Sequence, residues 1–190
     1  TVRPLSFVSP RPSADICEVA AVKRADLVIM GWHKPVLGRA VLSGTVHDVM
    51  GHAPTSVAVL VDRGLEWIGR VLVPFRGGPH DRGALALGLR IARHVGAKVT
   101  VLQVLNLDPK AAGGADDAAS TLADLHGETF ANGGRIEVKK LDHSEPIHAV
   151  IEECETGYDL VVVGASADWG LEHRSFGMQP ETIVRDCPAS

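Results

Sequence analysis

Apolar positions along this chain fall into two patterns that alternate from one end to the other. Short uninterrupted apolar runs predict strands, and stretches with apolar residues at i, i+3, i+4 and i+7 predict helices with one buried side. The predicted strands cover residues 4–8, 27–30, 57–61, 71–75, 99–105, 136–141 and 160–163, and the predicted helices cover residues 13–23, 46–52, 81–95, 120–130, 144–154 and 181–186. Residues 106–118 have the composition of a loop.

Strands that alternate with helices indicate parallel βαβ units, and therefore an α/β fold with an open, doubly wound parallel sheet. The runs at 27–30, 57–61 and 160–163 show no polar alternation, which is typical of strands buried on both faces. Ser144 is the predicted N-cap of the helix that follows it, and Gly96 is the predicted stop of the helix at 81–95.

The chain carries an internal repeat. When the sequence is aligned with itself at a fixed offset, residues 26–31 (Asp-Leu-Val-Ile-Met-Gly) align with residues 159–164 (Asp-Leu-Val-Val-Val-Gly). At the same offset Gly44 aligns with Gly177. Agreement across a strand, a loop and a helix indicates two copies of one structural unit.

The two copies are unequally complete. With a gap of one residue in the alignment, Ala-Pro-Thr-Ser at 53–56 aligns with Cys-Pro-Ala-Ser at 187–190. The first copy then continues into the predicted strand from Val57 to Val61, whereas the second copy ends at residue 190 of the sequence. Because position 1 is Thr and not Met, the chain is interpreted as a piece of a longer polypeptide. We expect the back half of the first repeat in residues 1–63, a connection in residues 64–69, and a second repeat without its last strand in residues 70–190.

Composition excludes several classes of protein. With 45% hydrophobic residues the chain has enough apolar material for a core, so disorder is not expected. Its 19 basic and 23 acidic side chains give a net charge of −4, so nucleic acid is not an expected partner. The apolar runs are far shorter than the ~20 residues of a membrane-spanning helix, and no targeting signal follows Thr1.

No reactive or metal-binding constellation stands out. Cys17, Cys154 and Cys187 form no CxxC pair and are expected to be small buried side chains in a reducing compartment. The nine histidines are scattered without ligand spacing, which argues against zinc. No GxSxG, Walker lysine motif or nucleophile–base pair is present, so we assign no catalytic residue and no metal ligand, and expect no enzyme activity.

The loops after residues 27–30 and 160–163 carry glycines at a characteristic spacing. In the first copy Gly31 is followed by Gly44 and Thr45, and in the second copy Gly164 is followed by Gly177. Both loops resemble the universal stress protein family, whose nucleotide-binding members carry G-x2-G-x9-G-[ST] at this point. The resemblance implies a Rossmann-like open parallel sheet, adenine nucleotide alpha hydrolase-like, with strand order 3-2-1-4-5.

The same resemblance implies a phosphate-binding loop in each copy. Glycines let the backbone approach a phosphate, and the following helix offers unpaired N–H groups and the positive end of its dipole. The candidate nucleotide-binding or phosphate-binding residues are Gly31, Lys34, Gly44 and Thr45 in the first copy and Arg76, Gly77, Gly78, Gly164, Ala165 and Gly177 in the second. No cofactor is required, and the candidate ligand is ATP, AMP or another adenine nucleotide.

The sequence departs from the family pattern at several positions. Lys34 replaces the second motif glycine of the first copy, and Ala167 and Met178 occupy two motif positions of the second. Arg76 stands about where ATP-binding members carry an acidic residue. The alternatives are that the loops are held for packing alone, that the segment at Arg76 is an ordinary βα turn, and that Asp81 is a helix-capping acid.

Two further segments resemble one particular group of proteins that contain such repeats. Pro-Phe-Arg-Gly-Gly-Pro-His-Asp-Arg at 74–82 and Gly-Trp-His-Lys-Pro at 31–35 are similar to the cytoplasmic tail of bacterial sodium/proton-type antiporters. Plant cation/proton exchangers have a similar Gly-Gly-Pro-Asp-Asp-Arg segment.

The leading hypothesis is a non-catalytic regulatory, nucleotide-sensing domain of a monovalent cation/proton antiporter, on the cytoplasmic side of the cell membrane. Its partners would be the transmembrane domain of the same polypeptide and a second copy, paired through the strand from Val57 to Val61. The alternative is a free-standing cytoplasmic tandem universal stress protein that binds ATP or AMP.

Overall fold

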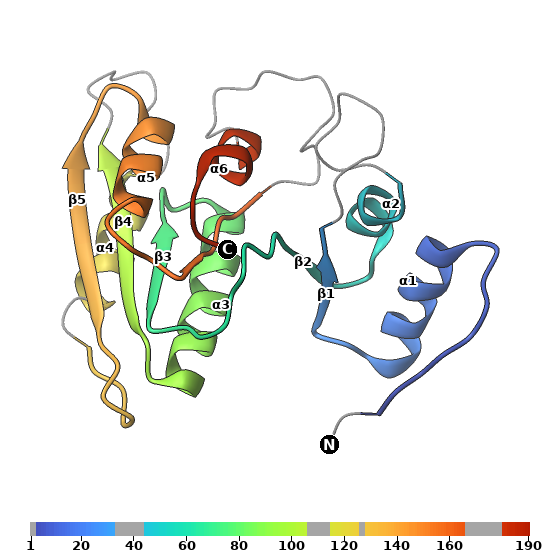
Figure 1. Cartoon of the computed structure of the whole chain (residues 1–190). Coiled ribbons are helices and arrows are strands. Elements are labelled where there is room, and N and C mark those ends of the chain that lie inside the picture. The colour runs from blue at the N-terminus through green and yellow to red at the C-terminus, as the bar shows by residue number, and fades with distance from the viewer. Residues whose placement is uncertain (1–2, 33–43, 106–114, 126–127, 166–179) are drawn as a thin grey trace. The chain divides into compact units, whose positions relative to one another are not determined.

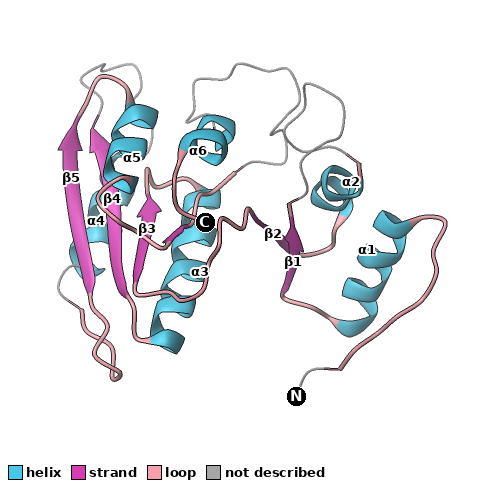
Figure 2. Ribbon diagram, viewed as in Figure 1, coloured by secondary structure: helices cyan, strands magenta, loops and turns pink. Residues whose placement is uncertain are grey.

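The computed structural model describes residues 3–32, 44–105, 115–125, 128–165 and 180–190 (Figures 1 and 2). The chain divides into two units, Thr1–Asp62 and Arg63–Ser190, which are described in turn. Strands and helices alternate, and each strand pairs in parallel with its neighbour, so the predicted α/β fold with parallel sheets is confirmed. Within these described ranges, no helix is both long and apolar enough to cross a bilayer.

The first unit contains two helices and two strands. The C-cap of its first helix is Arg24, whose φ of 50° ends the helix in the left-handed region. The two strands pair over their whole length, with Leu27 opposite Ser56. The elements of this unit are α1 (Pro12–Lys23), β1 (Leu27–Gly31), α2 (Thr45–His52) and β2 (Ser56–Leu60).

Two predictions for the first unit are wrong. Residues 4–8 form no strand but an irregular, mostly exposed segment, because no described strand pairs with them. The run at 27–30 is not buried on both faces, since the Ile29 side chain on β1 is 66% exposed. In the described part of this unit, the two helices and two strands leave one face of the sheet without the covering elements of a doubly wound sheet.

The second unit is a four-stranded parallel sheet with helices between its strands. Its elements are β3 (Arg70–Pro74), α3 (Pro79–Val95), β4 (Lys98–Leu105), α4 (Ala115–Leu125), β5 (Ile136–Asp142), α5 (Pro146–Cys154), β6 (Leu160–Val161) and α6 (Pro180–Asp186). The strand order across the sheet is β5-β4-β3-β6, which is 3-2-1-4 in order of appearance. Among the described residues after Asp62 no fifth strand joins this sheet, so the complete order 3-2-1-4-5 stays a prediction.

The core of the second unit lies on both faces of its central strands. Val71 and Val73 of β3 face α3, whereas Leu72 faces α5 and α6, and all three are fully buried. A Cβ on Gly88 of α3 would lie 2.8 Å from the Val73 side chain, so the helix packs on the strand at a distance that favours glycine. The other face is filled by a cluster of Leu72, Leu102, Val150, Cys154, Tyr158, Ile183 and Cys187.

Some element boundaries differ from the predicted ones. α4 begins at Ala115, inside the predicted loop, because the alanine-rich sequence there favours a helix. The N-cap of α5 is Glu145 and not Ser144, because Pro146 takes the first helical position, where its missing N–H costs nothing. In β6 only Leu160 and Val161 are in the ladder, so this strand is shorter than predicted.

Ser190 continues the sheet beside β6. Its N–H donates to the Asp159 carbonyl at 3.3 Å, and its own carbonyl accepts the N–H of Val161 at 2.8 Å. These two bonds are those of a residue opposite Leu160 in a parallel ladder. The equivalent pair in the first unit is Ser56 opposite Leu27, so the pairing follows the register of the sequence repeat.

Candidate functional site

The predicted phosphate-binding residues of the second unit begin where β3 ends. The N–H of Phe75 makes one more backbone bond, to β4, before the chain turns. Arg76, Gly77 and Gly78 then form the turn into α3, called the β3–α3 turn below. Gly77 has a φ of 97°, a conformation that favours glycine.

Two backbone N–H groups of the β3–α3 turn already bind a carboxylate of the same chain. The Oδ2 atom of Asp81, in the first turn of α3, accepts the N–H of Arg76 at 3.0 Å and that of Gly78 at 3.2 Å. Asp81 thereby caps α3, which confirms its prediction as a capping acid. A phosphate on this turn would have to compete with that carboxylate for the same N–H groups. This geometry favours an ordinary βα turn over an open anion site.

Gly164, just after β6, packs against the same turn of helix. A Cβ on Gly164 would lie 2.5 Å from the carbonyl carbon and oxygen of His80 and 2.7 Å from the nitrogen of Asp81. These distances leave no room for a side chain, so packing alone requires glycine here. The structure thus brings Gly164 next to the β3–α3 turn, and the partly buried Ala165 follows it.

The first unit places its motif residues at the two ends of a loop. Gly31 is the last residue of β1, and no described atom lies within 4 Å of the position of its Cβ. Gly44 is the N-cap of α2, with φ 67° and ψ −139°, and Thr45 is the first helical residue. The backbone therefore requires glycine at 44 but not at 31. Lys34 and Gly177 lie outside the described residues.

A polar network that sequence reasoning missed lies at the opposite, amino end of the sheet. Asp159 accepts the N–H groups of Gly69 and Arg70, both at 2.8 Å, on one carboxylate oxygen. The Arg70 guanidinium donates in turn to the carbonyls of Thr156 at 2.8 Å and Gly157 at 2.6 Å. In the sequence, the aspartate of the Asp-Leu-Val segment, which occurs in both copies of the repeat, was the feature that could have indicated this network. This network ties the start of β3 to the start of β6.

Tyr158 joins that network to a buried ion pair. The Arg70 guanidinium lies 4.4 Å from the centroid of the Tyr158 ring, and the phenol donates to Glu153 Oε1 at 2.9 Å. Lys139 donates to the other oxygen of Glu153 at 2.5 Å, and Glu153 is only 6% exposed. Burial raises the pKa of Tyr158, and Glu153 adds to this rise, whereas a hydrogen bond from Thr100 opposes it. We assign this network a structural role.

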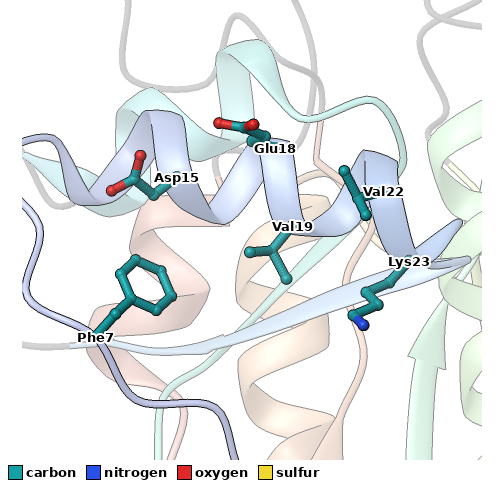
Figure 3. Close-up of a pocket in the computed structure, with 6 residues that line it drawn as sticks. All are labelled: Phe7, Asp15, Glu18, Val19, Val22 and Lys23. Atoms are coloured by element: carbon teal, nitrogen blue, oxygen red, sulfur yellow. The ribbon is translucent and has the colours of Figure 1, made fainter.

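Neither a group of metal ligands nor the cavity beside α1 provides an alternative to the predicted phosphate site within the described residues. Among the described residues no group of three His, Cys, Asp or Glu side chains could hold a metal ion. A cavity of about 330 Å³ lies beside α1 in the first unit, and Figure 3 shows the side chains around it. None of them belongs to the predicted site. The lining residues are Phe7, Asp15, Glu18, Val19, Val22 and Lys23.

Comparison with protein families divides the chain in almost the same place as the structure does. Residues 68–190 match the universal stress protein family, and residues 1–65 match the plant cation/H(+) antiporter domain.

The similar curated proteins include antiporters of Arabidopsis thaliana. Cation/H(+) antiporter 15 is 32% identical over an alignment of 160 positions, which covers 75% of this chain and 18% of that protein. Cation/H(+) antiporter 20 is 37% identical over an alignment of 140 positions, which covers 55% of this chain and 17% of that protein. The chain therefore spans less than a fifth of the length of these relatives.

The fold has a counterpart among solved structures. The crystal structure of a universal stress protein from Archaeoglobus fulgidus matches 94% of this chain and 63% of its own, with a TM-score of 0.63 and 16% identity. At that identity the likeness shows the fold alone. The match over residues 68–190 shows the family, and this chain belongs to the universal stress protein family.

Proposed function

We propose that this chain is a non-catalytic regulatory module of a monovalent cation/proton antiporter, attached to the transport domain on the cytoplasmic side of the membrane. The observation that carries the proposal is the direct succession of an antiporter-associated domain at 1–65 and a universal stress protein domain at 68–190. The alignment with cation/H(+) antiporter 15 supports it, because it covers 75% of the chain and so includes parts of both domains. A bacterial origin of the transporter stays a prediction, since the antiporters reported above are from a plant.

The proposed organisation is one and a half repeats: the back half of a first repeat in residues 1–63, a connection in 64–69 and a second repeat in 70–190. The matching registers of the two units support it. Ser56 stands opposite Leu27 as Ser190 stands opposite Leu160.

The proposed ligand is an adenine nucleotide or another phosphate-bearing molecule near Gly164, Gly177 and the β3–α3 turn. The approach of Gly164 to this turn supports a common site. Arg76 supplies a charge-assisted donor, but Asp81 occupies two N–H groups of the turn. The affinity is therefore expected to be lower than that of an open glycine-rich loop.

Regulation requires that the ligand or a partner bind two transporter states unequally, and a coupling of ~1–3 kcal/mol is typical. Self-association through β2 is part of the proposal. Among the described residues β2 pairs on one edge only, with β1, and an unpaired edge accepts a strand from another chain.

Cation/proton exchange in reconstituted vesicles tests the regulatory function. The complete transporter that carries this chain is compared with a version lacking it, with Arg76→Ala and with the control Arg90→Ala, an exposed arginine of α3. We expect the deletion to change the rate or the pH dependence of exchange, and Arg76→Ala to change only the response to ATP or AMP. Unchanged rates, pH dependence and assembly in every version would leave a passive tail.

The second candidate function is a free-standing tandem universal stress protein that binds ATP or AMP in the cytoplasm, favoured by the family match itself. The residues encoded before Thr1 separate the two candidates, because a transporter has a series of apolar segments of ~20 residues. Calorimetry of the isolated chain with ATP, AMP and a cyclic dinucleotide tests the ligand. No heat of binding with any of them would remove the nucleotide from both proposals.

A further inference from the structure

Two of the three cysteines meet in the core of the second unit. Cys154 is the last residue of α5, and Cys187 follows α6, where its N–H donates to the Ile183 carbonyl at 2.9 Å. Both are free thiols, 1% and 4% exposed, in one apolar cluster. Each of the two thiols shifts the pKa of the other. A thiol at the end of α5 and a thiol just after α6 therefore lie in the same buried cluster.

Three groups stabilise a thiolate at Cys187. The hydrogen bond from Cys154 is the largest contribution, and the N–H of Ala189 and the positive charge of Arg63 add to it. Arg63 is held near this segment because its guanidinium donates to the Val184 carbonyl at 2.5 Å. These groups outweigh burial and lower the pKa of Cys187, whereas the same hydrogen bond and burial raise the pKa of Cys154. Cys187 is therefore the thiol that ionises more readily, and a thiolate is the reactive form of cysteine.

We propose that Cys154 and Cys187 are a redox modification site, which a peroxide converts to a reversible intramolecular disulfide. The Cys187 thiolate attacks one oxygen of hydrogen peroxide, so that an S–O bond forms, the O–O bond breaks, and the departing hydroxide takes a proton to become water. The Cys154 sulfur loses its proton and attacks the sulfenic sulfur, so that an S–S bond forms and the oxygen leaves as a second water. The two thiols lose two electrons, and the peroxide gains them.

Cys187 is the thiol that reacts with the peroxide first. Its neighbours in the chain, Asp186 and Pro188, are exposed, whereas Cys154 ends a helix whose core-facing side is buried. A local opening of the segment after α6, which releases the two backbone bonds of Ser190 to the β6 strand, exposes the Cys187 sulfur, and such local openings require less free energy than global unfolding. This inference goes beyond the proposed function and does not depend on it.

The cross-link encloses residues 155–186, which include β6, Gly164 and α6. Because Gly164 contacts the first turn of α3, oxidation restrains the strand end at the candidate site. In the unfolded chain the same cross-link removes conformational freedom, so the oxidised protein is expected to melt at a higher temperature than the reduced protein.

Peptide mapping of the oxidised 190-residue chain tests the proposal. The chain is treated with hydrogen peroxide, its remaining thiols are blocked with iodoacetamide, and it is digested with trypsin without reduction. The three cysteines fall in three tryptic peptides, residues 1–23, 141–174 and 186–190. The expected product is a linked pair of 141–174 and 186–190 that dithiothreitol separates, while the peptide 1–23 stays unlinked.

Matched variants and a denatured sample complete the test. Cys17→Ser is expected to keep the linked pair, and Cys187→Ala is expected to abolish it. In urea, where the fold no longer selects partners, linked peptides that contain Cys17 are expected as well. Full alkylation of Cys154 and Cys187 after peroxide, a sulfinic acid on Cys187 without a cross-link, or native cross-links through Cys17 alone would each overturn the proposal.

The peptide map of the wild-type chain decides the question by itself, so a Cys187→Ala variant that fails to fold does not weaken it. The readout contains neither nucleotide nor transport, so its failure is distinct from a failure of the proposed function.

Discussion

Gly164 and His80 are so close that no side chain fits between them, since a Cβ on Gly164 would stand 2.5 Å from the His80 carbonyl group. This contact joins the end of β6 to the first turn of α3, beside the carboxylate of Asp81 that closes the β3–α3 turn. Spacing alone would assign Gly164 to the approach of a phosphate. In this protein packing already requires the glycine, whether or not a ligand binds.

Gly164→Ala is expected to destabilise the second unit by about 1–3 kcal/mol, because the added methyl overlaps backbone atoms of α3. Gly83→Ala is the matched control, since Gly83 is exposed on α3 with nothing within 4 Å of its Cβ position. There alanine is expected to stabilise the helix by about 0.5–1 kcal/mol. Urea unfolding measures both, and a Gly164→Ala protein as stable as wild type would contradict the packing argument.

Gly44→Ala is expected to destabilise the first unit by about 1–3 kcal/mol, because alanine does not tolerate the backbone conformation of Gly44. Gly31→Ala is expected to be tolerated, because the Cβ position there is open and the backbone is an ordinary strand. Thermal unfolding checks both. If the first loop binds phosphate, Gly31→Ala lowers the affinity while stability stays unchanged, and a parallel loss of both would argue against a ligand role.

Asp81→Ala is expected to lower stability by about 1–2 kcal/mol, because two N–H groups lose their acceptor, and Asp81→Asn is expected to cost less. Removing the negative charge from the β3–α3 turn is expected to tighten the binding of phosphate or ATP. Calorimetry compares Asp81→Asn with Asp124→Asn, which makes the same charge change at an exposed position of α4. Equal affinities in the two variants would show that the turn is not the anion site.

Tyr158 is expected to ionise at a higher pH in the folded than in the unfolded chain, because burial raises its pKa above the ordinary value for tyrosine. It is the only tyrosine, so the ultraviolet absorbance of tyrosinate reports it alone. Since the fold favours the neutral phenol, this stabilisation is complete below the unfolded pKa and is lost as the pH rises through the folded pKa. In Tyr158→Phe, the free energy of unfolding is expected to fall less steeply at alkaline pH. At neutral pH this variant is expected to be less stable by about 1 kcal/mol, because the hydrogen bond of the phenol is missing. A tyrosinate midpoint equal to that of the denatured chain would contradict this.

Lys139→Met is expected to destabilise the second unit by about 1–3 kcal/mol, because it leaves the buried Glu153 carboxylate with fewer donors. Adding Glu153→Gln is expected to recover part of the loss, since the remaining side chain is then neutral. Lys140→Met, at an exposed position of the same strand, is the control. Denaturant unfolding of wild type, Lys139→Met, Glu153→Gln and the double variant gives the coupling energy, and strict additivity of the Lys139 and Glu153 changes would disprove the pairing.

Local features of this fold could be predicted from the sequence. The alternation of apolar runs with helical periodicity predicts nearly every described element, Gly96 marks the end of α3, and Asp81 lies in its first turn. These signals are local, because a strand, a helix or a cap depends on residues a few positions apart. The position of the candidate site follows from them too, because the carboxyl ends of parallel strands lie at one edge of a sheet.

Only the tertiary structure decided which surfaces meet. Apolar periodicity predicts that Cys154 and Cys187 are buried, but it does not predict that they lie in the same cluster. It predicts a buried strand at Ile29, which the structure leaves exposed because burial depends on the elements that cover a strand and not on the strand itself. The contact of Gly164 with α3 likewise joins segments far apart in the chain, and sheet order, not local sequence, brings such segments together.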